Sequence, residues 1–267
     1  MVFFEYKQFT YFNVIKEEKV TEKFIFVKKG LSKNEIVNLP ITKVYYDCDN
    51  NLKPEFKNSK ITHLVITNKF TKKLDNLPNN LKYLYIKGEF YPKNEYIVDK
   101  LPNSLELLHC DHSCNRIISV LPPKLKYLRI NELNNFIDNL PSSLIYLKTN
   151  FDFNKPIDFL PASLKYLYFG RNFNQPIINL PSGILELKLN KLFEQPLSNF
   201  PPNLKKLVLR KTINHPVILP SSLEYLDIKY CSIDKDIDIV LPSSLKLLNK
   251  TGCYYKFNIH EGLDVIH

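Results

Sequence analysis

Residues 160–180 read LPASLKYLYFGRNFNQPIINL, and Leu180-Pro181 opens a second copy of the same pattern. The unit has three parts: a Leu-Pro pair, a Leu-x-x-Leu-x-apolar segment and a Phe-Asn-x-Pro-apolar segment. Self-similarity at a fixed period of this length is the sequence signature of a repeat architecture. The fold can therefore be derived from the columns, which are the positions at which successive copies carry the same type of residue.

Leu-Pro pairs recur along most of the chain. From Leu101 onward the steps between them are 20, 19, 20, 20, 20, 19 and 22 residues, with Phe200-Pro201 counted as one pair. Earlier pairs begin at Leu39 and Leu77, which is two periods apart. Proline fixes φ and removes a backbone donor. Prolines at two points of each unit therefore set corners and exclude a regular helix from the return path.

The Leu-x-x-Leu-x-apolar segment predicts one short strand per unit. Successive residues of a strand point to opposite faces, so we expect its apolar residues to point inward. A second inward column is expected twenty residues apart, at Phe153, Phe173, Phe193, Ile213 and Ile233. The expected inward strand sets are Ile41/Val44/Tyr46, Ile61/Leu64/Ile66, Leu81/Leu84/Ile86, Leu105/Leu108/Cys110, Leu125/Leu128/Ile130, Leu144/Leu147/Thr149, Leu164/Leu167/Phe169, Ile184/Leu187/Leu189, Leu204/Leu207/Leu209 and Leu223/Leu226/Ile228.

A single unit of this length cannot bury its own apolar residues. Stacked units place each column in line, so that neighbouring coils cover one another. We therefore expect a solenoid of about twelve coils with one long parallel β-sheet, prolines and loops on the return side, and little α-helix. Within Leu160–Leu180, the expected core includes Leu164, Phe173 and Leu180.

The unit resembles a known repeat. Phe173-Asn174-Gln175-Pro176-Ile177, with Leu160–Leu167 ahead of it, is very similar to the FNIP repeat, which is related to leucine-rich repeats. The resemblance covers roughly residues 39–250 and implies leucine-rich-repeat-like coils; a right-handed β-helix of the same period stays open. The family is abundant in social amoebae and in large DNA viruses of amoebae. Some members carry an F-box-like domain, for which residues 1–38 are too few.

The organisation expected is one repeat domain over residues 1–267. Residues 1–38 are expected to form an N-terminal cap, as coils or a β-hairpin, with Phe24/Phe26 equivalent to Val44/Tyr46. Residues 39–250 are the repeats, with an insertion at 87–100. Residues 251–267 form a degenerate last repeat or cap, in which Leu263 and Ile266 would mark a last strand without proline.

By the resemblance, strand residues between the inward ones face the concave side of the solenoid. Tyrosine and arginine are enriched at binding hot spots, so this face is the candidate partner surface. The same tyrosines could instead form structural ladders against their neighbours. The candidate binding residues are Tyr83, Tyr85, Tyr127, Arg129, Tyr146, Lys148, Tyr166, Tyr168, Lys188, Lys206 and Tyr225.

A recurring asparagine is interpreted as structural. Asn154, Asn174 and Asn214 occupy one position of the unit, and Asn115 and Asn134 are related to it. In half-buried loops, backbone groups need hydrogen-bond partners. We therefore expect these side chains to bond the backbone of neighbouring coils.

No cofactor, metal or catalytic site is expected. His109-Cys110-Asp111-His112-Ser113-Cys114 invites a metal interpretation, but register places Cys110 and Cys114 in inward columns as small core residues. With six glycines there is no phosphate-cradling loop, and the six histidines are dispersed. The sequence therefore favours a protein that is not an enzyme.

The function expected is a protein-interaction scaffold that recognises a partner protein through its concave sheet, acting as a monomer. The net charge of +10 leaves a basic nucleic-acid-binding surface as an alternative. A structural, self-assembling component is the third hypothesis. The partner itself is unknown from sequence.

Five irregularly spaced cysteines are unlike a disulfide framework and indicate a reducing compartment. Residues 1–7 lack a signal-peptide pattern, and no apolar stretch approaches the length of a membrane span. We therefore expect a cytoplasmic location without membrane contact, in the host cytoplasm if the protein is viral.

Overall fold

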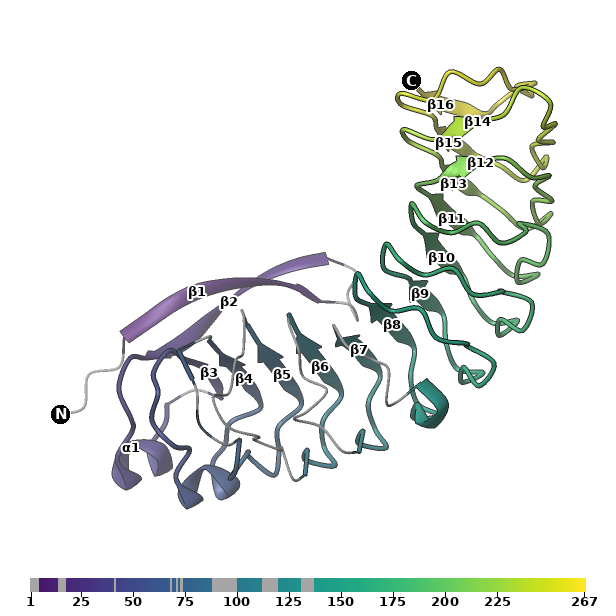
Figure 1. Ribbon diagram of the computed structural model, residues 1–267. Helices are drawn as coiled ribbons and strands as arrows, with labels where there is room; N and C mark the ends of the chain where they lie inside the picture. Colours follow the sequence, from purple (N-terminus) through teal and green to yellow (C-terminus); the bar gives the residue numbers. More distant parts are fainter. Residues whose placement is uncertain are drawn as a thin grey trace. The chain divides into compact units, whose positions relative to one another are not determined.

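The computed structural model consists of stacked β-coils that divide into two compact units, residues 1–132 (unit 1) and 133–267 (unit 2). Figure 1 shows one short strand in most coils, with the return segments on one side of the strands. The two units are described separately. The structure describes residues 5–13, 18–40, 42–67, 69, 70, 72, 74–87, 100–111, 120–130 and 137–267.

Unit 1 begins with a long antiparallel hairpin. Its described strands are β1 (Glu5–Asn13), β2 (Glu18–Val27), β3 (Lys43–Tyr46), β4 (His63–Ile66), β5 (Tyr83–Ile86), β6 (Leu107–Cys110) and β7 (Tyr127–Ile130). β1 and β2 are antiparallel, whereas the described pairings that follow in this unit, from β2–β3 to β6–β7, are parallel. Of the two forms considered for the N-terminal cap, the structure has the hairpin.

The register of the hairpin corrects one expectation. Ile25 pairs with Val44 and Val27 with Tyr46, a shift of 19 residues rather than 20. Ile25 and Val27 are therefore the inward residues, at 0% and 3% exposure. Phe26 instead lies on the outward side and stacks on Tyr45, with ring centroids 4.8 Å apart. The assignment of Phe24/Phe26 as the equivalents of Val44/Tyr46 was wrong by one residue, because the step from β2 to β3 is 19 residues and not the twenty residues of the repeat.

Helical structure is short, as expected. It comprises α1 (Lys33–Val37) and the 3₁₀ turns η1 (Pro54–Asn58) and η2 (Ile137–Asn139). α1 is held by a reciprocal cap: the Glu35 backbone N–H donates to Ser32 Oγ, and the Ser32 N–H donates to Glu35 Oε2. This Ser-x-x-Glu pattern is visible in the sequence and signals a helix start.

Unit 2 is the more regular stack. Its strands are β8 (Tyr146–Thr149), β9 (Tyr166–Tyr168), β10 (Glu186–Leu189), β11 (Lys206–Leu209), β13 (Tyr225–Asp227), β15 (Leu247–Asn249) and β16 (Asp264–Ile266). They pair in chain order and in parallel, with Leu147, Leu167, Leu187 and Leu207 in line. On the return side, β12 (Thr212–Ile213) pairs with β14 (Ser232–Ile233).

The last strand departs from the expected register. Val265, not Ile266, pairs with the inward Leu248. The expected last strand is present as β16, with Leu263 buried at 9% exposure just before it, whereas Ile266 is 46% exposed and does not continue the inward column. The coil that ends in β16 is shorter than its neighbours, and the strand is therefore displaced by one residue.

The core follows the predicted columns. The second-column rings stack along unit 2, with centroids 5.9 Å apart for Phe153–Phe173 and 6.0 Å for Phe173–Phe193. Each of these rings is at most 1% exposed, and burying one contributes about 1.5–3 kcal/mol. Leu180 is only half-buried, unlike Leu39 and Leu77, so its assignment to the core was too strong.

Side-chain ladders satisfy the backbone of the turns. Asn154 Oδ1 accepts from the Asn174 N–H at 2.9 Å, and Asn174 Oδ1 accepts from the Glu194 N–H at 2.8 Å. The expected asparagine ladder is therefore present at these two steps.

A second ladder was not anticipated: the serine of Leu-Pro-x-Ser-Leu donates a hydrogen bond to a backbone carbonyl of the preceding coil. These bonds run from Ser104 to Leu81, Ser163 to Leu144, Ser222 to Leu204 and Ser244 to Leu223.

Replacing Asn174 tests the ladder. Asn174→Ala leaves the Glu194 N–H without its acceptor, and we expect the free energy of unfolding to fall by about 1 kcal/mol and the melting temperature by a few degrees. Circular dichroism melting measures this. The matched control is Asn199→Ala, an exposed position on the same side of the coils. Equal melting temperatures for the two variants would contradict a stabilising ladder.

Candidate functional site

The predicted binding residues all lie on the outward face of the strands, which is the face opposite the coil interior. Each occupies the first or third position of its strand, where side chains alternate with the buried leucines. In unit 1 these residues are Tyr83, Tyr85, Tyr127 and Arg129. In unit 2 they are Tyr146, Lys148, Tyr166, Tyr168, Lys188, Lys206 and Tyr225.

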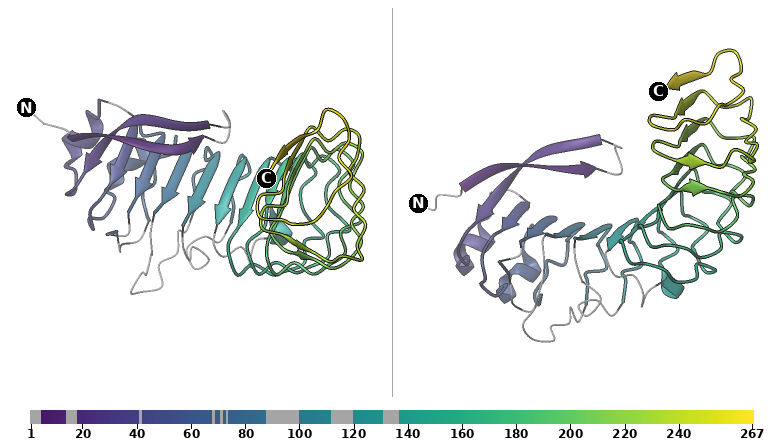
Figure 2. Two further views of the ribbon diagram at one scale, coloured as in Figure 1. Left: turned by 90° about the horizontal axis from the view of Figure 1, so that it is seen from above. Right: turned by 45° about the horizontal axis from the view of Figure 1, so that its top comes forward.

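In unit 1 the hairpin lies over this face. Figures 1 and 2 place β1 and β2 over the first strands of the parallel sheet of unit 1, on the side opposite the return segments. Glu22 of β2 forms an ion pair with Lys43. Tyr127, expected to be open to a partner, is 7% exposed. Among the unit 1 candidates, Arg129 keeps an exposed side chain, while Tyr83 and Tyr85 are half-buried.

Aromatic stacking aligns two pairs of rings on the unit 1 face. His63 stacks on Tyr83 at 4.1 Å between centroids, and Tyr85 stacks on His109 at 4.2 Å. Burial, followed by the positive charge of Lys43, lowers the pKa of His63 to about 4. His63 is therefore neutral at physiological pH and acts as an aromatic surface.

The carboxylate of Asp111 contacts both residues of the second stacked pair, Tyr85 and His109. Asp111 Oδ2 accepts from the Tyr85 hydroxyl at 2.7 Å, and Asp111 Oδ1 lies 2.9 Å from His109 Nε2. Burial alone would raise the pKa of Asp111, but hydrogen bonds from His109 and Tyr85 and the charges of His109 and Arg129 hold it at about 2. This cluster is internally satisfied, which favours the structural interpretation of Tyr85.

In unit 2 the outward face has a tyrosine cluster at one end. The Tyr146 ring lies 5.2 Å from Tyr168 and 6.4 Å from Tyr166, in tilted contacts. Burial, and then the charge and hydrogen bond of Glu186, raise the pKa of Tyr168. The three rings are half-buried, so each offers part of an amphipathic ring surface.

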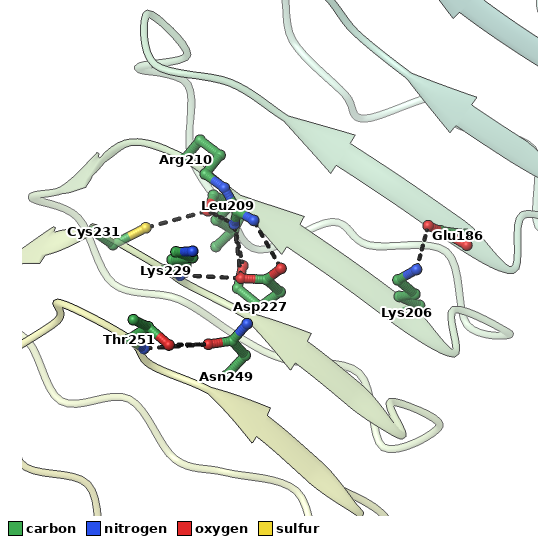
Figure 3. Close-up of polar contacts among 9 residues, drawn as sticks. All are labelled: Glu186, Lys206, Leu209, Arg210, Asp227, Lys229, Cys231, Asn249 and Thr251. Atoms are coloured by element: carbon green, nitrogen blue, oxygen red, sulfur yellow. Dashed lines mark hydrogen bonds and ion pairs between the residues drawn. The ribbon is translucent and has the colours of Figure 1, made fainter. Parts of the chain in front are cut away.

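Charged residues dominate the middle of the same face. Figure 3 shows Arg210 and Asp227 directed toward each other, with N–O distances of 2.8 and 2.7 Å in a bidentate pair. Lys206 pairs separately with Glu186 at 2.9 Å, from the directly opposed strand position. The Lys206 ammonium also lies 5.4 Å from the centroid of the Tyr225 ring. Ion pairs therefore connect neighbouring coils across this face.

The sequence patterns alone assign no role to Glu186, Asp227 or Arg210. The signal was available in part: Glu186 and Lys206 are twenty residues apart and fall opposite each other in register. The Arg210–Asp227 contact spans 17 residues and links neighbouring columns, so the repeat period alone does not reveal it.

The metal hypothesis gains no support from the described residues. Cys110 is fully buried, as expected for an inward position. His112 and Cys114 lie outside the described residues. Within the described residues there is no group of three His, Cys, Asp or Glu side chains arranged to hold a metal ion. No helix in the same set is long and apolar enough to cross a membrane.

These features define a class of protein: a leucine-rich-repeat-like solenoid with a patterned outward face. The chain resembles the crystal structure described as CroV588, a novel circular LRR protein, with a TM-score of 0.58 and 25% identity over 84% of this chain and 42% of that chain. YopM from Yersinia enterocolitica WA-314 gives a TM-score of 0.52 at 19% identity, over 84% of this chain and 57% of that one. The chain thus spans about half the length of these structures, and the first likeness decides for leucine-rich-repeat coils over a β-helix.

The repeat itself is also identified. Residues 134–172 and 153–192 match the FNIP Repeat family model. This part of the chain therefore carries FNIP-type repeats, within a solenoid of leucine-rich-repeat-like fold. No curated protein matches the sequence.

The Asp111 carboxylate predicts a specific acid sensitivity. Its pKa of about 2 lies below the reference value of 3.8, so its contribution to stability is complete above that value and is lost as pH falls toward 2. With solvent screening, we expect this contribution to be about 1–2 kcal/mol. Urea unfolding at pH values across this range should show a steeper loss for the native protein than for Asp111→Asn. Parallel pH profiles would exclude the role, and Asp238→Asn, at an exposed site, serves as control.

The Arg210–Asp227 pair should stabilise unit 2. Asp227 is 8% exposed, and Asp227→Ala leaves a half-buried guanidinium without its partner. We expect the free energy of unfolding to fall by about 2 kcal/mol in urea titrations. Asp234→Ala, at an exposed aspartate, should change it by no more than about 0.5 kcal/mol. The double variant Arg210→Met with Asp227→Leu should recover most of the loss; no loss in Asp227→Ala would refute the pair's role.

Proposed function

We propose that the protein is a non-enzymatic interaction scaffold that recognises a partner protein through the outward face of unit 2. The observation that carries the proposal is the arrangement of Tyr146, Tyr166 and Tyr168 beside the ion-paired strands β10–β13. Leucine-rich-repeat folds are typically scaffolds for protein interaction. A parallel sheet with short strands holds these side chains at fixed spacing, which limits the entropy lost on binding.

Unit 1 has a different part in this proposal. Its outward face lies beneath the β1–β2 hairpin, and Tyr127 is already buried there. We therefore assign the unit 1 tyrosines to structural contacts and the unit 2 tyrosines to recognition. Of the candidate residues, this selects Tyr146, Lys148, Tyr166, Tyr168, Lys188, Lys206 and Tyr225 as the binding set.

The proposal includes a monomeric protein in a reducing cytoplasm. Its support is the state of the cysteines: the four described ones, Cys48, Cys110, Cys231 and Cys253, are buried thiols. Burial raises the pKa of the Cys231 thiol to about 11, which keeps it protonated and unreactive. Such thiols pack as small apolar residues and need no oxidising environment.

The test is affinity capture from an extract of the cells in which the protein is made, with the native protein and the variant Tyr146→Ser/Tyr166→Ser/Tyr168→Ser. Because interface tyrosines commonly contribute more than 1 kcal/mol each, we expect the variant to lose at least about tenfold in retained partner. Mass spectrometry of the captured proteins measures this.

The control variant Tyr83→Ser tests a stacked tyrosine beneath the hairpin and should retain the partner. Light scattering and melting curves must show each variant folded and monomeric. If the unit 2 variant is folded and captures the same proteins in the same amounts, the proposed surface is wrong.

A further inference from the structure

The outward face of unit 2 concentrates positive charge. Over residues 133–267 there are 15 basic and 12 acidic side chains. The outward positions of its strands, with the outward residues just before and after them, hold eight of the basic and four of the acidic ones. The remainder of the unit is close to neutral. The basic residues of the face are Lys148, Lys165, Lys188, Lys205, Lys206, Arg210, Lys229 and Lys246, and the acidic ones are Glu186, Glu224, Asp227 and Asp264.

Most acidic groups on this face already have basic partners. Glu224 pairs with both Lys205 and Lys246, each at 2.7 Å. Glu186 pairs with Lys206, and Asp227 with Arg210. These contacts occupy four cations of the face and leave an excess of positive charge on the others.

Lys188 stands out among the others. Its neighbours across the sheet are Tyr168 on β9 and Val208 on β11, and neither is a carboxylate. In the part of unit 2 that the structure describes, which is residues 137–267, no carboxylate lies within ion-pair distance of its ammonium. Burial, and next the positive charge of Arg210, lower the pKa of Lys188. A half-buried cation of this kind carries a desolvation cost that the charges of Asp227 and Glu186 offset only in part, and an incoming anion would relieve the remainder.

The chemistry of that anion is constrained by the rest of the face. A nucleic acid presents closely spaced phosphates, and these would meet Glu186, Glu224 and Asp227 as well as the lysines. A protein segment places its carboxylates singly, between neutral and donor groups, and matches a face of mixed charge. The half-buried rings of Tyr146 and Tyr168 suit the apolar parts of such a segment.

We infer that the partner of this face is an acidic protein segment, one of whose side-chain carboxylates pairs with Lys188 between Tyr168 and Val208. This rests on the proposed function, because it names the chemistry of the partner for the same surface. Glu186 and Asp227 act as a selectivity element by repelling uniformly anionic chains. The lysines around them supply the long-range attraction.

The experiment uses the full chain and two labelled probes of equal charge, a peptide in which ten glutamates alternate with serines and a single-stranded deoxythymidine oligonucleotide. Fluorescence anisotropy gives the dissociation constants at low salt. We expect the peptide to bind more tightly than the oligonucleotide. Lys188→Gln should weaken the peptide about fivefold, the effect of one partly exposed ion pair. The matched control Lys155→Gln removes the same charge from an exposed residue on the return side and should weaken it less than about twofold.

Melting curves separate binding from a structural role. Because Lys188 forms no ion pair among the described residues, Lys188→Gln should melt no lower than the native protein, whereas Lys206→Gln loses the Glu186 pair and should melt lower.

Equal weakening of peptide binding by Lys188→Gln and Lys155→Gln would overturn the inference, as would tighter binding of the oligonucleotide than of the peptide. A captured partner that needs the three tyrosines but not Lys188 would also overturn it while leaving the proposed function standing. A captured partner that needs Lys188 but not the tyrosines would support the acidic contact and contradict the tyrosine surface.

Discussion

The whole structure depends on direct register between successive parallel strands. Leu147, Leu167, Leu187 and Leu207 lie opposite one another, and so do the residues on either side of them. A coil of this size has no interior of its own, so its leucines and phenylalanines are buried only when the next coil repeats them in phase. A shift of one residue would turn the inward set outward. The two places where the register differs from the one expected, β2 and β16, both lie at ends of the sheet's parallel stack.

Register also provides hydrogen-bond partners for the backbone of the return segments, most of which are not helical. Prolines remove donors at the corners, and the remaining backbone groups need partners in adjacent coils. The asparagine and serine ladders supply them through single side chains that recur at fixed positions. Because each ladder bond joins one coil to the next, the turns contribute to cohesion between coils as well as to the shape of each coil.

The same alignment organises the outward face. Outward residues twenty apart meet as cross-strand pairs, so repeated tyrosines become a cluster and alternated charges become ion pairs, such as Glu186 with Lys206. Where the charges do not alternate, as at Lys188, a cation is left between apolar neighbours. In the proposed function, recognition therefore depends on breaks in the repeat, since a face in which every charge is paired offers a partner little electrostatic gain.

The sequence by itself determined the solenoid, its period, the inward columns and the asparagine ladder, because each is a property of spacing that every coil repeats. It did not determine the burial of Tyr127, the inward role of Ile25 in place of Phe24, or the pairing of Arg210 with Asp227. These were decided by tertiary structure. Tyr127 is buried although Arg129 on the same face of the same strand is exposed, and the Arg210 contact joins different columns. Burial and charge at an outward position depend on the segments that cover the sheet and on residues at other positions of the neighbouring coils. A repeat period encodes only the residues at the same position of the neighbouring coils.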